Sequence, residues 1–181
     1  MREHVEARHN RAAPFSPPSP TLMISILPNW HPMTVHFALA LPITATLLIS
    51  LARVAPERAF ATSAVQAAKW SLAIGIAALW LSIGTGMHAY LTEPMDAAAE
   101  QAVRVHQYWG WGTAAVFTMA PALWQAQHPK QVGLAMLVCC WLGTACASVT
   151  GWLGAENVYR HGVGVEARTT AEAVPPPTSA R

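Results

Sequence analysis

The chain has 181 residues, of which 53% are hydrophobic and 11% are charged, and its formal net charge is +2. A water-soluble domain carries about 25% charged residues, so the composition favours a protein whose solvent is lipid. The small net charge gives no basis for binding nucleic acid. The length suits one domain.

The first 27 residues are expected to form a disordered tail. They hold four prolines among scattered charges, and such a segment buries too little apolar surface to order itself. Met23 stands just before the first apolar run, so we expect that translation starts there. No cleavable signal peptide is recognised before that run.

Four segments are long and apolar enough to cross a bilayer, which takes about 20 residues. The expected spans cover residues 33–53, 69–92, 104–127 and 131–156. Their connections are short, so neighbouring spans should run antiparallel. The sequence therefore predicts an all-α fold, an up-down four-helix bundle in the membrane. The domain covers residues 28–165, and residues 166–181 form a second disordered tail with three consecutive prolines.

The histidines gather at one end of this bundle. In an up-down topology the first and third spans start on the side where the second and fourth end. Five of the eight histidines lie at those ends. They are His31, His36, His88, His106 and His161. Ionisable groups inside a membrane usually face the bundle interior and mark function, so we expect a shared histidine pocket.

Small residues lie one helical turn from two of these histidines. Gly84 precedes His88 by four residues, and Gly110 follows His106 by four, so each shares a helix face with its histidine. Such positions leave room for a flat group such as a porphyrin. Close helix packing with nothing bound is the plainer alternative.

The basic residues of the short loops predict the orientation. Arg53, Arg58, Lys69 and Lys130 lie on the side opposite the histidines. Because cytoplasmic loops are enriched in lysine and arginine, the histidine cluster and both termini are expected on the periplasmic side of a bacterial inner membrane.

Two motifs resemble a known family. The stretches "HPMTVHFALALPI" at 31–43 and "GWLGAENVYRHGVGV" at 151–165 are similar to the opening and closing motifs of the domain of unknown function 2231 family. The similarity covers about residues 28–165, with Ala38 where relatives often have proline. It implies a small four-span bacterial membrane protein without a settled activity. Some relatives are joined to periplasmic cytochrome-type modules, which implies redox work.

The first functional hypothesis is a protein that binds one b-type haem and transfers electrons. Two imidazoles on facing helices at equal depth ligate such a haem, and the expected ligands are His36, His88 and His106. His31 and His161 would lie behind these ligands or near the haem propionates, and Arg160 would pair with a propionate. The redox partner would be a quinone or a periplasmic cytochrome-type protein. No Cys-x-x-Cys-His motif for covalent haem occurs.

Two other hypotheses stay open. The same histidines, together with Glu93 or Glu156, suit a non-haem transition metal. A bundle without a cofactor would instead serve as an assembly or interaction subunit, with the histidines as a hydrogen-bonded polar cap. The chain carries no phosphate loop, nucleophile elbow or dinucleotide fingerprint, so at most we expect an electron-transfer subunit rather than an enzyme by itself.

Overall fold

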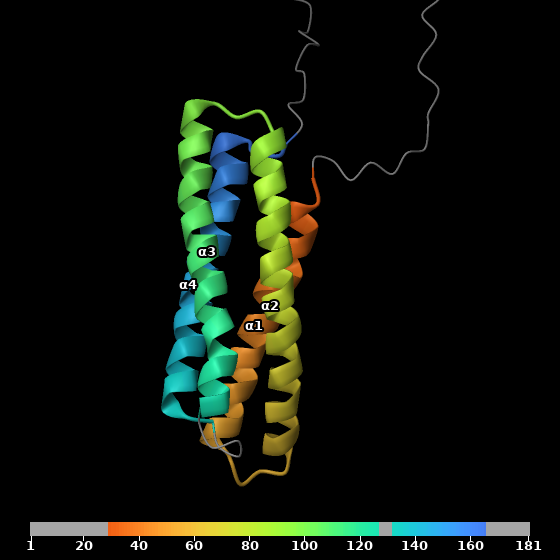
Figure 1. Ribbon diagram of the computed structural model, residues 1–181, viewed down its shortest axis with the longest axis vertical. Coiled ribbons are helices and arrows are strands. Elements are labelled where there is room, and N and C mark those ends of the chain that lie inside the picture. The colour runs from red at the N-terminus through yellow and green to blue at the C-terminus, as the bar shows by residue number, and fades with distance from the viewer. Residues whose placement is uncertain (1–28, 127–131, 166–181) are drawn as a thin grey trace, which may run out of the picture.

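A computed structural model describes residues 29–126 and 132–165 of the chain. This part consists of four α-helices, whose order and bounds are α1 (His31–Val54), α2 (Phe60–Thr92), α3 (Ala97–Ala126) and α4 (Leu134–His161). They run up and down as one bundle (Figure 1), which confirms the predicted all-α fold. The two expected tails, with Met23 in the first, lie outside the described residues.

Three of the four helices, α1, α2 and α4, are long and apolar enough to cross a membrane. Helix α3 has 30 residues, which is long enough, but it is less apolar than the other three described helices and does not count among the candidate spans. Its first turns carry Glu100, Gln101, Arg104, His106 and Gln107, which lower its mean hydropathy. The chain is thus a helical membrane protein, and a complete crossing by α3 stays a prediction.

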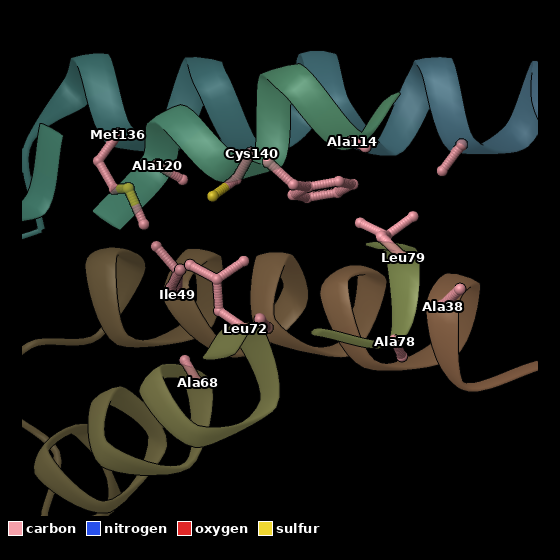
Figure 2. Packing of buried hydrophobic residues seen from close by; sticks show 13 residues of the cluster. Ala38, Ile49, Ala68, Leu72, Ala78, Leu79, Ala114, Ala120, Met136 and Cys140 are labelled. Atoms are coloured by element: carbon pink, nitrogen blue, oxygen red, sulfur yellow. The ribbon is translucent and has the colours of Figure 1, made fainter. Parts of the chain in front are cut away.

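The helices pack as two hairpins that face each other. Helix α1 packs on α2 and α4, and α3 packs on α4 and α2, so α1 and α3 lie diagonally across the bundle. Figure 2 shows Ile49 and Leu72 of the first hairpin pointing towards Met136 and Cys140 of the second.

Small residues set the distance between the helices of each hairpin. A Cβ atom added to Gly75 would lie 2.7 Å from the Pro42 ring, and one added to Gly143 would lie 2.9 Å from Phe117 Cζ. Pro42 and Phe117 are both fully buried. In lipid, where apolar side chains gain little from leaving the solvent, such close approach supplies much of the packing energy.

The two hairpins are built on the same register. Phe117 follows His106 by eleven residues, as Pro42 follows His31. Pro42 and Phe117 are buried, and both histidines are partly buried. The second helices match in the same way, because the spacing of Gly75, Ser82 and Gly86 recurs at Gly143, Thr150 and Gly154. Both hairpins run in the same direction (Figure 1). The two hairpins therefore make these contacts at the same spacing and run in the same direction.

The end of α4 explains the closing glycines of the second motif. Gly162 has a φ of 62° and Gly164 a φ of 73°, a conformation that costs little only for glycine. The Gly162 N–H donates to Val158 O at 3.1 Å, and the Val163 N–H donates to Asn157 O at 3.0 Å. This left-handed cap satisfies carbonyls that the helix end would otherwise leave unpaired.

Candidate functional site: a pair of histidines

His31 is the first residue of α1 and points at α2. Its Nδ1 lies 3.0 Å from the backbone oxygen of Ser82, and the hydroxyls of Ser82 and Thr85 lie 3.5 Å from the same nitrogen. A Cβ atom added to Gly86 would lie 2.9 Å from His31 Cε1. Gly86 is thus the position that lets the imidazole rest on α2.

His106 of α3 makes the equivalent contacts with α4. Its Nδ1 lies 3.0 Å from the backbone oxygen of Thr150, and a Cβ added to Gly154 would lie 3.2 Å from His106 Cε1. The Thr150 hydroxyl also lies 3.0 Å from that of Thr113 on α3. The first hairpin has a comparable threonine pair, since the hydroxyls of Thr34 and Thr85 are 3.0 Å apart.

The two imidazoles meet between the helices, near the end of the bundle where α1 begins. Their ring centroids are 6.2 Å apart and their planes make an angle of 81°. Both side chains are partly buried, and they come from helices that lie diagonally across the bundle. The shared spacing of the two hairpins brings the same residue type to the same depth from two sides.

The hydrogen bonds determine which ring nitrogen carries the hydrogen. A backbone carbonyl only accepts, so the bonds to Ser82 O and Thr150 O require that both Nδ1 atoms donate. In a neutral imidazole the other nitrogen, Nε2, then keeps its lone pair. An Nδ1–H bond to a carbonyl is also the usual support of a histidine that ligates a metal through Nε2.

The larger ligand set expected from the sequence does not come together around His106. His36, His88 and His161 are exposed on the outside of the bundle. Arg160, the expected propionate partner, is exposed and forms an ion pair with Glu156 of its own helix. Among the five histidines at this end, the structure therefore brings together His31 and His106, and the role of the others as ligands stays a prediction.

The two glycines expected to make room for a cofactor lie in open surroundings. A Cβ atom added to Gly84 would have no neighbour within 4 Å, and one added to Gly110 would come no closer than 3.9 Å, to Thr150 Cγ2. Helix packing therefore does not require glycine at either position. The glycines that do adjoin the imidazoles are Gly86 and Gly154, which the sequence analysis did not single out.

His31 stands on the buried face of α1, and His36 does not. The buried residues of α1 include Thr34, Ala38, Pro42 and Ala45, which recur every three or four positions. His31 continues that row, whereas His36 falls between its members. The depth of the five histidines in the bilayer, which follows from their positions along the helices, does not distinguish these two faces.

One buried polar atom close in sequence to the pair has no partner. The side-chain amide nitrogen of Gln107 is buried and, within residues 29–126 and 132–165, is the one such side-chain atom without a hydrogen bond. A buried donor without an acceptor costs about 1–3 kcal/mol. An acceptor bound beside this amide nitrogen would remove that cost.

The acidic groups at this end are engaged in other contacts. Asn29 donates to Glu93 Oε1 at 3.3 Å, and Tyr90 donates to Glu100 Oε1 at 2.9 Å. The hydrogen bond from Tyr90, together with one from Arg104, lowers the pKa of Glu100 below its usual value. In the part of the chain that the structure describes, no three His, Cys, Asp or Glu residues are grouped closely enough to hold a metal ion.

These features define a class, a helical membrane protein with a pair of polar, hydrogen-bonded imidazoles near one end of its bundle. A family model described as "Predicted membrane protein (DUF2231)" matches residues 28–167. The chain belongs to this family, as the two sequence motifs had indicated. No curated protein and no solved structure matches the chain.

Proposed function

We propose that the chain is a membrane electron-transfer protein that holds one b-type haem between His31 and His106. The observation that carries the proposal is the pair itself. Two imidazoles from diagonal helices meet edge to face, with centroids 6.2 Å apart. The Nδ1 of each is hydrogen-bonded to a backbone carbonyl of a neighbouring helix. Both Nε2 atoms therefore keep a lone pair for a ligand.

The number of protein side chains that could ligate a metal favours haem over a non-haem metal. A non-haem site in a protein normally takes three or four protein ligands, and the described residues group no three candidates. A haem already has four nitrogen ligands in its ring and takes one or two more from the protein. Two histidines are enough for it.

The spacing of the rings also suits a single iron. An imidazole nitrogen binds a first-row metal at about 2.0–2.1 Å, so two imidazoles on opposite sides of one ion have ring centres roughly 6.3 Å apart. His31 and His106 already stand at 6.2 Å. His31 and His106 would hold an iron at close to their present centroid separation if both Nε2 atoms turned towards it, and the helices would have to move apart to admit the ring of the haem.

The chain's own residues would then position the cofactor. Ser82 O and Thr150 O hold the two imidazoles in one tautomer. Their hydrogen bonds to Nδ1 make each Nε2 a stronger ligand for a metal. When bound, the haem supplies reversible one-electron transfer.

The place of the pair in the membrane indicates the kind of redox partner. One layer of histidines near one end of the bundle makes a single redox centre, so the second electron carrier must reach that end. A quinone dissolved in the bilayer or a periplasmic cytochrome-type protein meets this requirement. The periplasmic side is part of the proposal and rests on the distribution of basic residues in the loops.

The same contacts favour a second candidate, a bundle without cofactor in which the histidines fasten each hairpin. Each ring bridges two helices through a hydrogen bond to a backbone carbonyl, and the rings touch edge to face. In that case the chain acts as an assembly or interaction subunit. A spectrum distinguishes the two candidates.

The test is the absorption spectrum of the full chain, purified in detergent from cells supplied with haem precursor and measured oxidised and dithionite-reduced. We expect a sharp α band on reduction in the wild type, and loss of that band in His31→Ala and in His106→Ala. The matched controls are His36→Ala and His88→Ala, because both side chains are exposed at the same end. These two variants should keep the band.

Two results would overturn the proposal. A colourless wild-type protein, with no haem extractable into acid acetone, would leave the bundle without cofactor. A band that survives His31→Ala and disappears in His36→Ala or His88→Ala would instead assign the haem to the ligands expected from the sequence.

A further inference from the structure

A second feature lies at the opposite end of the bundle, near the α1–α2 connection at the bottom of Figure 1. It is a cavity of about 720 Å³ between the last turn of α1, the first turns of α2 and the start of α4. Ligand sites in proteins have volumes of about 300–1,000 Å³. The cavity is thus large enough for a headgroup of a lipid or for another small molecule.

The charged groups that line the cavity within residues 29–126 and 132–165 are both positive. Arg53 and Lys69 line it together with the polar side chains of Thr62 and Gln66, and no acidic residue of those ranges belongs to the lining. The nearest acidic residue in sequence, Glu57, forms an ion pair with Arg58, outside the lining. Two cations that share a cavity repel each other, and a bound anion removes that repulsion.

Lys69 is held in place by an aromatic ring. Its Nζ lies 5.1 Å from the centroid of the Trp124 ring on α3, which is within the range of a cation–π contact. Holding the ammonium in this way lowers the entropy lost when it binds a ligand. The remaining lining is largely apolar, including Val65, Val132 and Leu134.

We infer that this cavity binds an anionic phosphate group, with the headgroup of an acidic phospholipid as the expected source. The cavity lies at the end of the membrane helices. Trp70, the residue after Lys69 in the sequence, is exposed, as tryptophans often are at an interface. Phospholipid phosphates are the most abundant anions at that level. The apolar part of the lining would contact the first carbons of the acyl chains.

Native mass spectrometry of the full chain in detergent tests the inference, with dioleoylphosphatidylglycerol and dioleoylphosphatidylcholine as probes. We expect the phosphatidylglycerol to bind more tightly, because the choline headgroup carries a compensating positive charge. Arg53→Gln and Lys69→Gln should each weaken phosphatidylglycerol binding about fivefold, since a basic residue near an anionic lipid contributes about that factor.

The matched control is Arg58→Gln, which removes the same charge from the same connection but outside the lining. It should bind phosphatidylglycerol as the wild type does. Salt provides a test that needs no substitution. Binding of phosphatidylglycerol to the wild type should fall steeply between low and high ionic strength, so the inference stays testable even if Lys69→Gln fails to fold.

The source of the phosphate group follows from competition. If millimolar inorganic phosphate displaces phosphatidylglycerol from the wild type, the cavity is a site for the free anion as well as for the lipid headgroup, whereas a lack of displacement assigns the site to the lipid. Equal binding of the two lipids, or an undiminished preference for phosphatidylglycerol in the double variant Arg53→Gln/Lys69→Gln, would overturn the inference. The haem spectrum should stay unchanged in all these variants, so this test is independent of the histidine pair.

Discussion

His31 and His106 are far apart in the sequence and touch edge to face, with ring centroids 6.2 Å apart and planes at 81°. Each ring is attached to a different neighbour, His31 to α2 and His106 to α4. The contact between them therefore joins the two hairpins, whereas the hydrogen bonds join the helices within each hairpin. This division leads to a stability prediction for the protein without a cofactor, in which the two rings are in contact.

Replacing both histidines should not have an additive effect on stability. His31→Ala and His106→Ala each remove one hydrogen bond, with a net cost of about 0.5–1.5 kcal/mol, and both remove the same contact between rings. The double variant should therefore lose less than the sum, by about 0.5 kcal/mol or more. Unfolding by sodium dodecyl sulfate, followed by circular dichroism, measures this coupling.

The control for that cycle is the pair His36 and His88. Both are exposed, so His36→Ala and His88→Ala should change the free energy of unfolding by less than about 0.5 kcal/mol and should add. Additive effects for His31 and His106 as well would mean that the two rings do not touch in the membrane.

The glycines beside the imidazoles should not tolerate a methyl group. Gly86→Ala places a Cβ 2.9 Å from His31 Cε1, whereas Gly84→Ala meets nothing within 4 Å. Both variants gain the same helix propensity from alanine, so their difference isolates the clash. We expect Gly86→Ala to be less stable than Gly84→Ala by about 1–3 kcal/mol, measured by thermal unfolding in detergent.

Gly154→Ala should show a smaller effect of the same sign, because its added Cβ would lie 3.2 Å from the imidazole of His106. In a haem-bound protein both variants should also shift the absorption spectrum, since they push on the proposed ligands. A Gly86→Ala variant as stable as Gly84→Ala would show that the ring of His31 does not lie against α2.

The glycines at the centre of the bundle should be more sensitive than those at its end. In Gly75→Ala the added Cβ would lie 2.7 Å from Cδ and Cγ of Pro42, which is fully buried and rigid. Gly143→Ala meets Phe117 at 2.9 Å, but an aromatic side chain has torsions that let it shift. Gly75→Ala should therefore cost more, about 2–3 kcal/mol in the free energy of unfolding.

Gly112→Ala is the control for these two variants, because nothing lies within 4 Å of its added Cβ. It should leave the midpoint of thermal unfolding unchanged or raise it. If Gly143→Ala turns out to be the most destabilising of the three, the relative rigidity assigned to Pro42 and Phe117 is wrong.

The connection between α2 and α3 should weaken in acid. Hydrogen bonds from Tyr90 and Arg104 lower the pKa of Glu100 in the folded chain, so the carboxylate stabilises the fold at neutral pH. That contribution is complete above the pKa of the unfolded chain and is lost as the pH falls through the lower, folded value. Between pH 7 and pH 3, Glu100→Gln should therefore lose less thermal stability than the wild type does.

Glu57→Gln is the comparison for this experiment. Glu57 also pairs with an arginine, but both side chains are 70% exposed, and no tyrosine donates to it. The pH dependence of Glu57→Gln should match that of the wild type. Equal pH dependence of all three proteins would show that the contact of Glu100 with Tyr90 and Arg104 does not hold the connection.

The sequence by itself determined the solvent, the number of helices and the family. Low charge and long apolar runs require lipid, and short connections require antiparallel neighbours, whatever the details of packing. Pro32 in the first turn of α1 and Gly162 after the last turn of α4 mark these two helix ends, although the expected fourth span ended at residue 156 and α4 continues to His161. Such signals are local, so they survive without knowledge of the fold.

Only the tertiary structure decided which histidines meet. Depth in the bilayer depends on position along a helix, and the sequence placed five histidines at one end. Whether a side chain faces the bundle or the lipid depends on rotation about the helix axis, which packing contacts such as Gly75 against Pro42 and Gly143 against Phe117 determine. Those contacts join residues of different helices, and for that reason they turned His31 inward with His106 and left His36 and His88 outside.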